Sequence, residues 1–78
     1  MRLNFQFYNL QNEGTQKFID YKLARTGHFY TSLFETITLA DNNNIERLRK
    51  SFPEEVEAQQ NFANRVGWWE SMCSQLGI

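Results

Sequence analysis

The side chains best suited to nucleophilic or metal chemistry are scarce in this sequence. Its 78 residues include one histidine, His28, and one cysteine, Cys73. A catalytic nucleophile needs a general base beside it, and a metal site needs several ligands, so neither residue has the partners that it would require. We therefore expect no enzyme activity, no metal and no cofactor. His28 fits a helix start or an exposed position, and Cys73 fits a buried, inert thiol.

Acidic residues concentrate at Glu54, Glu55 and Glu57, directly after Pro53. Catalysis by paired carboxylates requires two carboxyl groups that face each other across a cleft, whereas these three are neighbours on one segment. Proline is tolerated in the first turn of a helix, and acidic side chains there complement the positive N-terminal end. The pattern therefore indicates a helix start rather than a catalytic pair.

Basic residues concentrate at Arg47, Arg49 and Lys50. Binding to nucleic acid depends on a basic face that neutralises phosphates. Here Glu46 precedes the basic residues, acidic residues follow at 54–57, and the formal net charge of the chain is −1. Nucleic-acid contact through Arg47, Arg49 and Lys50 is therefore kept as an alternative hypothesis, and it is disfavoured.

Aromatic residues are the most numerous candidates for molecular recognition, with seven Phe, three Tyr and two Trp. Trp68 and Trp69 are adjacent, and neighbours on a helix point about 100° apart, so we expect one of the rings to stay near the surface. Large exposed aromatic side chains commonly anchor protein interfaces. The competing interpretation, in which both rings belong to the core, stays open. The candidate protein-interaction residues are Phe5, Phe7, Tyr8, Tyr30 and Trp69.

The first 14 residues differ in pattern from the rest of the chain. Leu3, Phe5 and Phe7 alternate with polar residues, which is the period of a half-buried strand. Residues 12–14 are Asn, Glu and Gly, which favour a turn. We predict an extended N-terminal arm or short strand over residues 1–14, packed on the helices of this chain or on a neighbouring chain.

From residue 15 onward the spacing of apolar residues is helical and predicts four to five short helices. The first covers 15–26, with Thr15 as N-cap and Gly27 as a left-handed terminator. The second lies within 28–41, and a capping box at Ser32 would start it near Leu33. A strand over 35–39 remains the alternative for this segment, because its residues also alternate.

Later helices are expected after Asn43, after Ser51 and after Gly67, each of which fits a helix start, and the last helix ends at Gly77. The apolar residues expected to face the core are Phe18, Ile19, Leu23, Phe29, Leu33, Ile37, Ala40, Ile45, Leu48, Phe52, Val56, Ala63, Val66, Trp68, Trp69, Met72 and Leu76. The predicted fold class is all-α, a compact bundle in which residues 15–78 form a single helical domain.

Part of the chain, from about residue 33 to residue 70, resembles a pattern in small helical accessory proteins of bacteriophages and mobile elements. The resemblance rests on Leu33-Phe34-Glu35, Ala40-Asp41, Arg47-Leu48, the run from Phe52 to Ala58, and Gly67-Trp68-Trp69-Glu70. It implies a short helical accessory protein, and it transfers no activity or site residue to this sequence.

We therefore expect a non-enzymatic protein that acts by protein–protein interaction, as a modulator or inhibitor of a host machine. Its partner would be another protein or a second copy of the chain in a homo-oligomer or larger assembly. No apolar run is long enough to span a membrane and no segment has the pattern of a signal peptide, so we expect a cytoplasmic location without a membrane partner.

Overall fold

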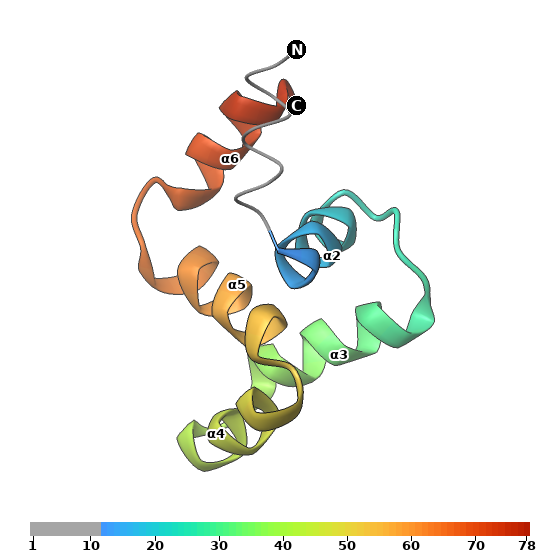
Figure 1. Ribbon diagram of the computed structural model, residues 1–78, viewed down its shortest axis with the longest axis vertical. Helices are drawn as coiled ribbons and strands as arrows, with labels where there is room; N and C mark the ends of the chain where they lie inside the picture. Colours follow the sequence, from blue (N-terminus) through green and yellow to red (C-terminus); the bar gives the residue numbers. More distant parts are fainter. Residues whose placement is uncertain (1–11) are drawn as a thin grey trace.

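Five helices follow one another along residues 12–78, the part of the chain that the computed structural model describes (Figure 1). They are α2 (Glu13–Lys22), α3 (His28–Leu39), α4 (Asn42–Ser51), α5 (Pro53–Asn64) and α6 (Trp68–Leu76). Residues 12–78 contain no strand, and 35–39 lie within α3, so the strand alternative for that segment is wrong. The all-α prediction is confirmed, whereas nearly all of the predicted arm, residues 1–11, lies outside the described residues.

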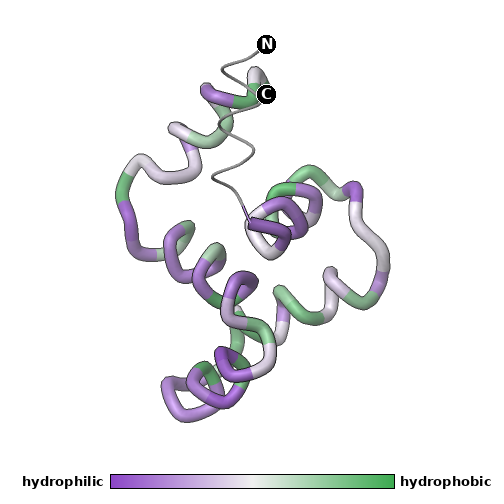
Figure 2. Tube along the Cα trace, viewed as in Figure 1, coloured by the Kyte–Doolittle hydropathy of each residue, from purple (hydrophilic) through white to green (hydrophobic). Residues whose placement is uncertain are grey.

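Helix α5 organises the bundle, because α2, α3, α4 and α6 all pack against it. Helix α2 crosses it near its start and also contacts α3, so these three helices enclose the interior. Helices α4 and α6 sit at opposite ends of the fold in Figure 1. The hydropathy of the trace in Figure 2 follows this arrangement, since α4 is largely hydrophilic while apolar and polar segments alternate along α3. The end helices therefore expose much of their surface.

The buried core has contributions from four helices. Its apolar members are Phe18, Ile19, Leu33, Phe34, Ile37, Ile45, Val56 and Ala58. Three residues expected in the core are exposed instead: Phe29 in the first turn of α3, Ala63 in the last turn of α5, and Val66 beyond it. The core prediction is therefore wrong for these three residues, which lie at or beyond helix ends, where fewer neighbouring side chains can cover them.

Several helix boundaries differ from the sequence prediction. Helix α2 begins at Glu13, because the Asn12 side chain rather than Thr15 caps it and accepts a hydrogen bond from the Thr15 backbone N–H at 2.8 Å. The left-handed residue after this helix is Ala24 (φ 58°), not Gly27, whose φ is −82°. Gly27 is instead the N-cap residue of α3, which therefore begins at His28 rather than near Leu33.

Helix α4 is capped by Asp41, whose carboxylate accepts from the Asn44 backbone N–H at 2.9 Å, and not by Asn43. Pro53 occupies the first turn of α5 as predicted, although Phe52 rather than Ser51 stands at its N-cap. The flanks of α6 are confirmed, since Gly67 and Gly77 both have positive φ, at 84° and 74°. Left-handed glycines thus delimit the last helix at both ends.

A glycine allows the close approach of α2 to α5. The backbone N–H of Gly14, in the first turn of α2, donates to Glu54 Oε1 at 2.9 Å. A Cβ at Gly14 would lie 2.7 Å from the carbonyl carbon of Glu54 and from the backbone nitrogen of Glu55. The Glu54 carboxylate therefore serves the N-terminal end of α2 as well as the start of its own helix, where helix dipoles favour a negative charge.

Candidate functional site

Residues with catalytic or metal-binding chemistry are not brought together. His28 is the exposed first residue of α3, as expected for a helix start, and Cys73 lies on α6. Cys73 is half-buried rather than buried, because α6 meets the rest of the bundle on one side only. Among residues 12–78 no group of three or more His, Cys, Asp or Glu is placed to hold a metal ion. The other candidate features of residues 12–78 are the aromatic clusters and the groove between α3 and α4.

The tryptophan pair belongs to an aromatic cluster centred on Phe18. The Phe18 ring centroid lies 6.0 Å from that of Trp68 and 6.2 Å from that of Trp69. Phe34 and Phe62 approach the same ring at 5.2 and 5.4 Å. The Trp68 and Trp69 centroids lie 6.5 Å apart, so both rings contact Phe18 from the same side although they are neighbours on α6. Both Trp side chains are half-buried, so the two rings share the contact with the core and neither is fully exposed or fully buried.

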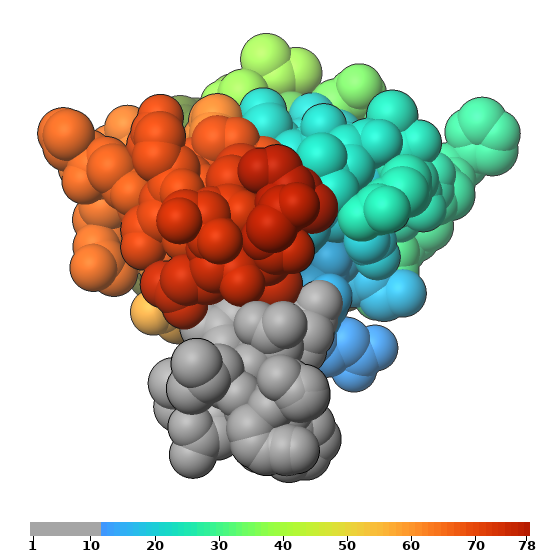
Figure 3. Space-filling model, turned by 90° about the horizontal axis from the view of Figure 1, so that it is seen from above, coloured from blue at the N-terminus to red at the C-terminus, as the bar shows by residue number. Residues whose placement is uncertain are grey.

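The Trp side chains also explain how α6 is attached. No residue of α6 is fully buried. In Figure 3 the red atoms of α6 adjoin the cyan atoms at the end of α2. The ring contacts of Trp68 and Trp69 with Phe18 of α2 agree with this placement. Trp69 additionally meets Phe62 of α5 edge-on, at 5.9 Å and 80°. The Trp69 ring therefore helps to attach α6 to the bundle, and only part of its surface is accessible to a partner.

Tyr30, another candidate interaction residue, lies at the start of α3, and its ring centroid is 6.3 Å from that of Phe34, so it adjoins the edge of the same aromatic cluster. Its ring meets that of Phe29 edge-on at 5.1 Å, and Lys17 Nζ lies 5.1 Å from its centroid. Phe29 is 59% exposed and reaches Phe52, at the end of α4, with centroids 6.1 Å apart. Tyr30 therefore adjoins the α3–α4 pair and not Trp69. The candidates Phe5, Phe7 and Tyr8 lie outside the described residues.

The basic candidates occupy different sides of α4. Arg49 Nε lies 3.6 Å from Glu46 Oε1 of the preceding turn. Arg47 and Lys50 are exposed and form no ion pair with any carboxylate of residues 12–78. Residues two apart on a helix point about 200° apart, so Arg47 faces nearly away from Arg49. The three residues do not form a single cationic face, but Arg47 and Lys50, three apart, share one side of the helix.

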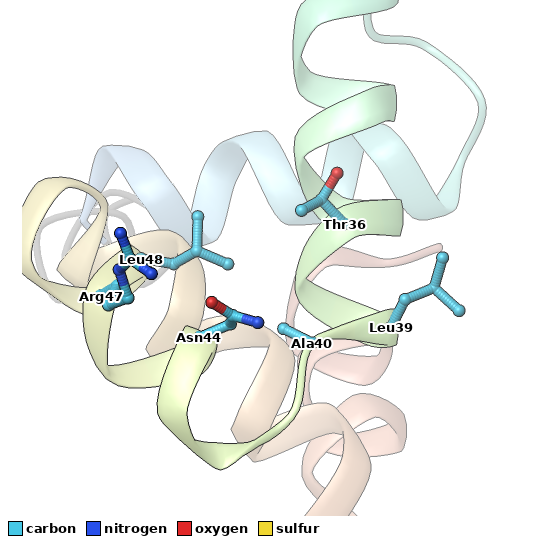
Figure 4. A pocket seen from close by; sticks show the side chains of 6 residues that line it. All are labelled: Thr36, Leu39, Ala40, Asn44, Arg47 and Leu48. Atoms are coloured by element: carbon cyan, nitrogen blue, oxygen red, sulfur yellow. The ribbon is translucent and has the colours of Figure 1, made fainter.

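A groove opens between α3 and α4, at the end of the bundle away from α6. We call it the α3–α4 groove, and it is lined by Thr36, Leu39, Ala40, Asn44, Arg47 and Leu48 (Figure 4). Ala40 and Leu48 are half-buried and pack against the hydrophobic core, so they form a fixed apolar floor. Leu39 stands on the rim with 85% of its surface exposed. Arg47 lies at the other rim, on α4.

The residues on the sides of α3 and α4 that border the groove explain why it stays open. On α3, residues at positions 29, 33, 36 and 40 share one side, and on α4 residues at 44, 48 and 52 do so. The Phe29–Phe52 contact fills one end of this seam. Toward the connection between the two helices the lining includes Thr36, Ala40 and Asn44, which are small or polar, while Leu48 lies on the floor and Leu39 on the rim. These side chains do not fill the gap between the helices.

Sequence reasoning did not identify Leu39, Thr36 or Asn44 as site residues. Leu39 lies four residues after the polar residue Glu35 and seven after Ser32 along α3, so it shares their outer side of the helix. A leucine on a polar helix side was the sequence feature that could have indicated this surface. A second hollow, lined by Tyr21, Glu35, Thr38 and Leu39, lies on its other side. Leu39 is therefore an apolar ridge between two hollows.

Comparisons with known proteins add no assignment to this geometry. No family model, no curated protein and no solved structure matches the chain. In the part of the chain that the structure describes, no helix has the length and apolar character required to cross a bilayer.

Proposed function

We propose that this protein is a small non-enzymatic accessory protein that acts by docking on another protein through the α3–α4 groove. The single observation that carries the proposal is Leu39, a leucine 85% exposed on the rim of a groove with an apolar floor. An isolated exposed leucine is ordinary, but one that adjoins a hollow with a core-anchored floor has the form of a hydrophobic binding groove.

The floor of the groove supports this function because it is pre-organised. Ala40 and Leu48 are held from below by the core that includes Ile37 and Ile45. A partner side chain that enters the groove meets a surface that needs little reordering, and less ordering on binding means a smaller entropic cost. Full burial of a leucine contributes about 1.5–3 kcal/mol, so covering Leu39 alone would strengthen binding by about one order of magnitude or more.

This proposal places the contact surface on α3 and α4 rather than on Trp69, whose ring is engaged with Phe18 and Phe62. Tyr30 and Phe29, at the start of α3, do not line the groove. The further proposal that the partner is a cytoplasmic host machine, and that the protein modulates or inhibits it, rests on the resemblance to bacteriophage accessory proteins alone.

The test compares the wild-type protein with two matched truncations of exposed apolar residues. Leu39→Ala removes the rim of the groove, and Val66→Ala removes an equally exposed side chain from the α5–α6 connection. Each protein is immobilised and exposed to a lysate of the source organism, and retained proteins are identified by mass spectrometry. The proposal predicts a partner retained by wild type and by Val66→Ala but lost with Leu39→Ala. Identical retention by all three proteins would contradict it.

Nucleic-acid binding is the second candidate function, favoured by one observation: Arg47 and Lys50 are exposed cations without a carboxylate partner among residues 12–78. Fluorescence anisotropy with a 20-nucleotide single strand and a 20-base-pair duplex, at two salt concentrations, tests this directly. Salt-sensitive binding that Arg47→Glu abolishes would support it, because displaced counterions give a steep salt dependence. The absence of binding at low salt would exclude it.

A further inference from the structure

Positive charge is concentrated on the helix that forms one wall of the α3–α4 groove. Helix α4 has three basic residues and a single acidic one, Glu46, whereas the whole chain has a formal net charge of −1. The Glu46 carboxylate is engaged by Arg49. The basic residues of α4 without an ion-pair partner among residues 12–78 are Arg47, which lines the groove, and Lys50, one turn further along the same side of α4.

The apolar floor of the groove and the basic residues at its rim lie next to each other. Ala40 and Leu48 form the apolar floor, and Arg47 stands directly beside Leu48 at the rim (Figure 4). Arg47 and Lys50 lie three residues apart, which on a helix is about one turn, or 5 Å. A helix laid in the groove with carboxylates one turn apart would match this pair while its apolar face met the floor and Leu39.

We infer that the occupant of the α3–α4 groove is an acidic amphipathic helix of another protein, with an apolar anchor and carboxylates that pair with Arg47 and Lys50. This inference rests on the function proposed above and names the chemistry of the partner. Amphipathic helices commonly bind in apolar grooves through residues spaced three and four apart. Charge complementarity at the rim then selects the partner and its orientation.

Nucleic acid fits the same surface less well than an acidic helix does. The floor of Ala40 and Leu48 and the exposed Leu39 would gain nothing from a phosphate backbone. The groove lining has no aromatic side chain on which a base could stack.

The chemical character of the partner can be determined without knowing its identity. A display library of random 16-residue peptides is selected for binding to the full-length protein. We expect enrichment of peptides with an excess of Asp and Glu and with Leu, Ile or Phe spaced three or four apart. One enriched peptide is then synthesised with a fluorescent label, and its dissociation constant is measured by anisotropy for wild type and variants.

Four variants separate the contributions of the apolar rim and of the charge. Leu39→Ala should weaken peptide binding about tenfold. Arg47→Glu should weaken it about three- to tenfold, the range for loss and reversal of one exposed ion pair. Arg25→Glu makes the same charge change in the exposed α2–α3 connection, and Val66→Ala removes an exposed apolar side chain elsewhere, so both should bind as wild type does. Added salt should weaken wild-type binding more than that of Arg47→Glu.

The outcomes distinguish this inference from the proposed function. Enrichment of neutral or basic peptides whose binding still depends on Leu39 would overturn the acidic partner and leave the docking groove standing. Failure to enrich any peptide, or binding indifferent to both Leu39 and Arg47, would overturn both. Tighter binding of single-stranded DNA than of the peptides would assign the surface to nucleic acid. Self-association in sedimentation velocity that Arg47→Glu abolishes would identify a second copy as the occupant instead.

Discussion

Replacing Gly14 with alanine tests the packing of α2 on α5 most sharply, because local propensity and tertiary structure predict opposite signs. Gly14 lies in the first turn of α2 with φ outside the left-handed region. Alanine in a helix is more stable than glycine by about 0.5–1 kcal/mol when only the helix itself is considered. An exposed position would therefore gain stability from Gly14→Ala.

The structure predicts a net loss instead. The new methyl group would lie 2.7 Å from the Glu54 carbonyl carbon and from the Glu55 backbone nitrogen, against 3.4–4 Å for ordinary contact. Backbone atoms cannot rotate away, so α2 and α5 must separate by roughly 1 Å, which also lengthens the 2.9 Å hydrogen bond from Gly14 to Glu54. Overpacking of this kind costs about 1–3 kcal/mol, and loss of a bond to a charged acceptor adds about 1.5 kcal/mol. Allowing for the propensity gain, we expect destabilisation of about 2 kcal/mol.

Thermal unfolding followed by circular dichroism at 222 nm measures this effect. For a domain of this size 1 kcal/mol corresponds to about 4–8 °C, so Gly14→Ala should lower Tm by about 8–16 °C. Gly27→Ala is the matched control, since nothing lies within 4 Å of a Cβ there and its φ of −82° suits alanine. The control should shift Tm by only a few degrees. A Gly14→Ala protein at least as stable as wild type would refute the packing argument.

Three further substitutions test other parts of the fold. Phe18→Ala removes the fully buried ring that α6 packs against; it should cost about 3–5 kcal/mol and abolish a cooperative melt, and a wild-type-like transition would contradict the role assigned to the cluster. Thr38→Val removes the hydroxyl that accepts from Gln59 Nε2 at 3.0 Å and should cost about 1 kcal/mol in urea unfolding. Addition of Gln59→Leu should recover part of that loss, whereas strictly additive losses would contradict the pairing. Asp41→Ala should cost about 1 kcal/mol by removing the cap of α4, while Asn43→Ala should be neutral; the reverse order would contradict the observed cap.

The helical character of the chain was predictable because spacing and punctuation agreed over most of its length. Phe18, Leu33, Ile37 and Val56 recur at helical intervals, and each is buried. Gly67 and Gly77 delimit α6 because a left-handed residue at these points has no good alternative to glycine. Local signals therefore determined the number of helices and much of the core.

Helix ends were harder to predict because several residues could serve as caps. Asn12 and Thr15 compete at the start of α2, and Asp41 and Asn43 compete at α4. Which one caps depends on where the chain must turn to pack, as the contact between Gly14 and Glu54 illustrates. Ala24 rather than Gly27 adopts the left-handed conformation because it directly follows the C-cap residue of α2 in a Schellman motif. In this motif the Ala24 N–H donates to the Tyr21 carbonyl at 3.0 Å and the Arg25 N–H donates to the Asp20 carbonyl at 2.7 Å.

The α3–α4 groove could not be predicted from local pattern. Thr36, Ala40 and Asn44 look unremarkable in sequence, and they line a groove only because the connection of Ala40 and Asp41 places the end of α3 beside α4 while both helices pack on α5. The exposure of Leu39 likewise depends on which neighbours reach the end of α3. A binding surface formed between two helices can be predicted only when the tertiary arrangement of those helices is known.

The central claim is that a partner occupies the α3–α4 groove, and amide chemical shifts report the bound surface residue by residue. The ¹⁵N-labelled protein is titrated with the enriched acidic peptide, and the backbone and indole N–H resonances are followed together. The account predicts that the largest shifts fall on residues 36–50, with the indole signals of Trp68 and Trp69 nearly unchanged. Shifts concentrated on α6 and the two indoles, with residues 36–50 unaffected, would contradict it.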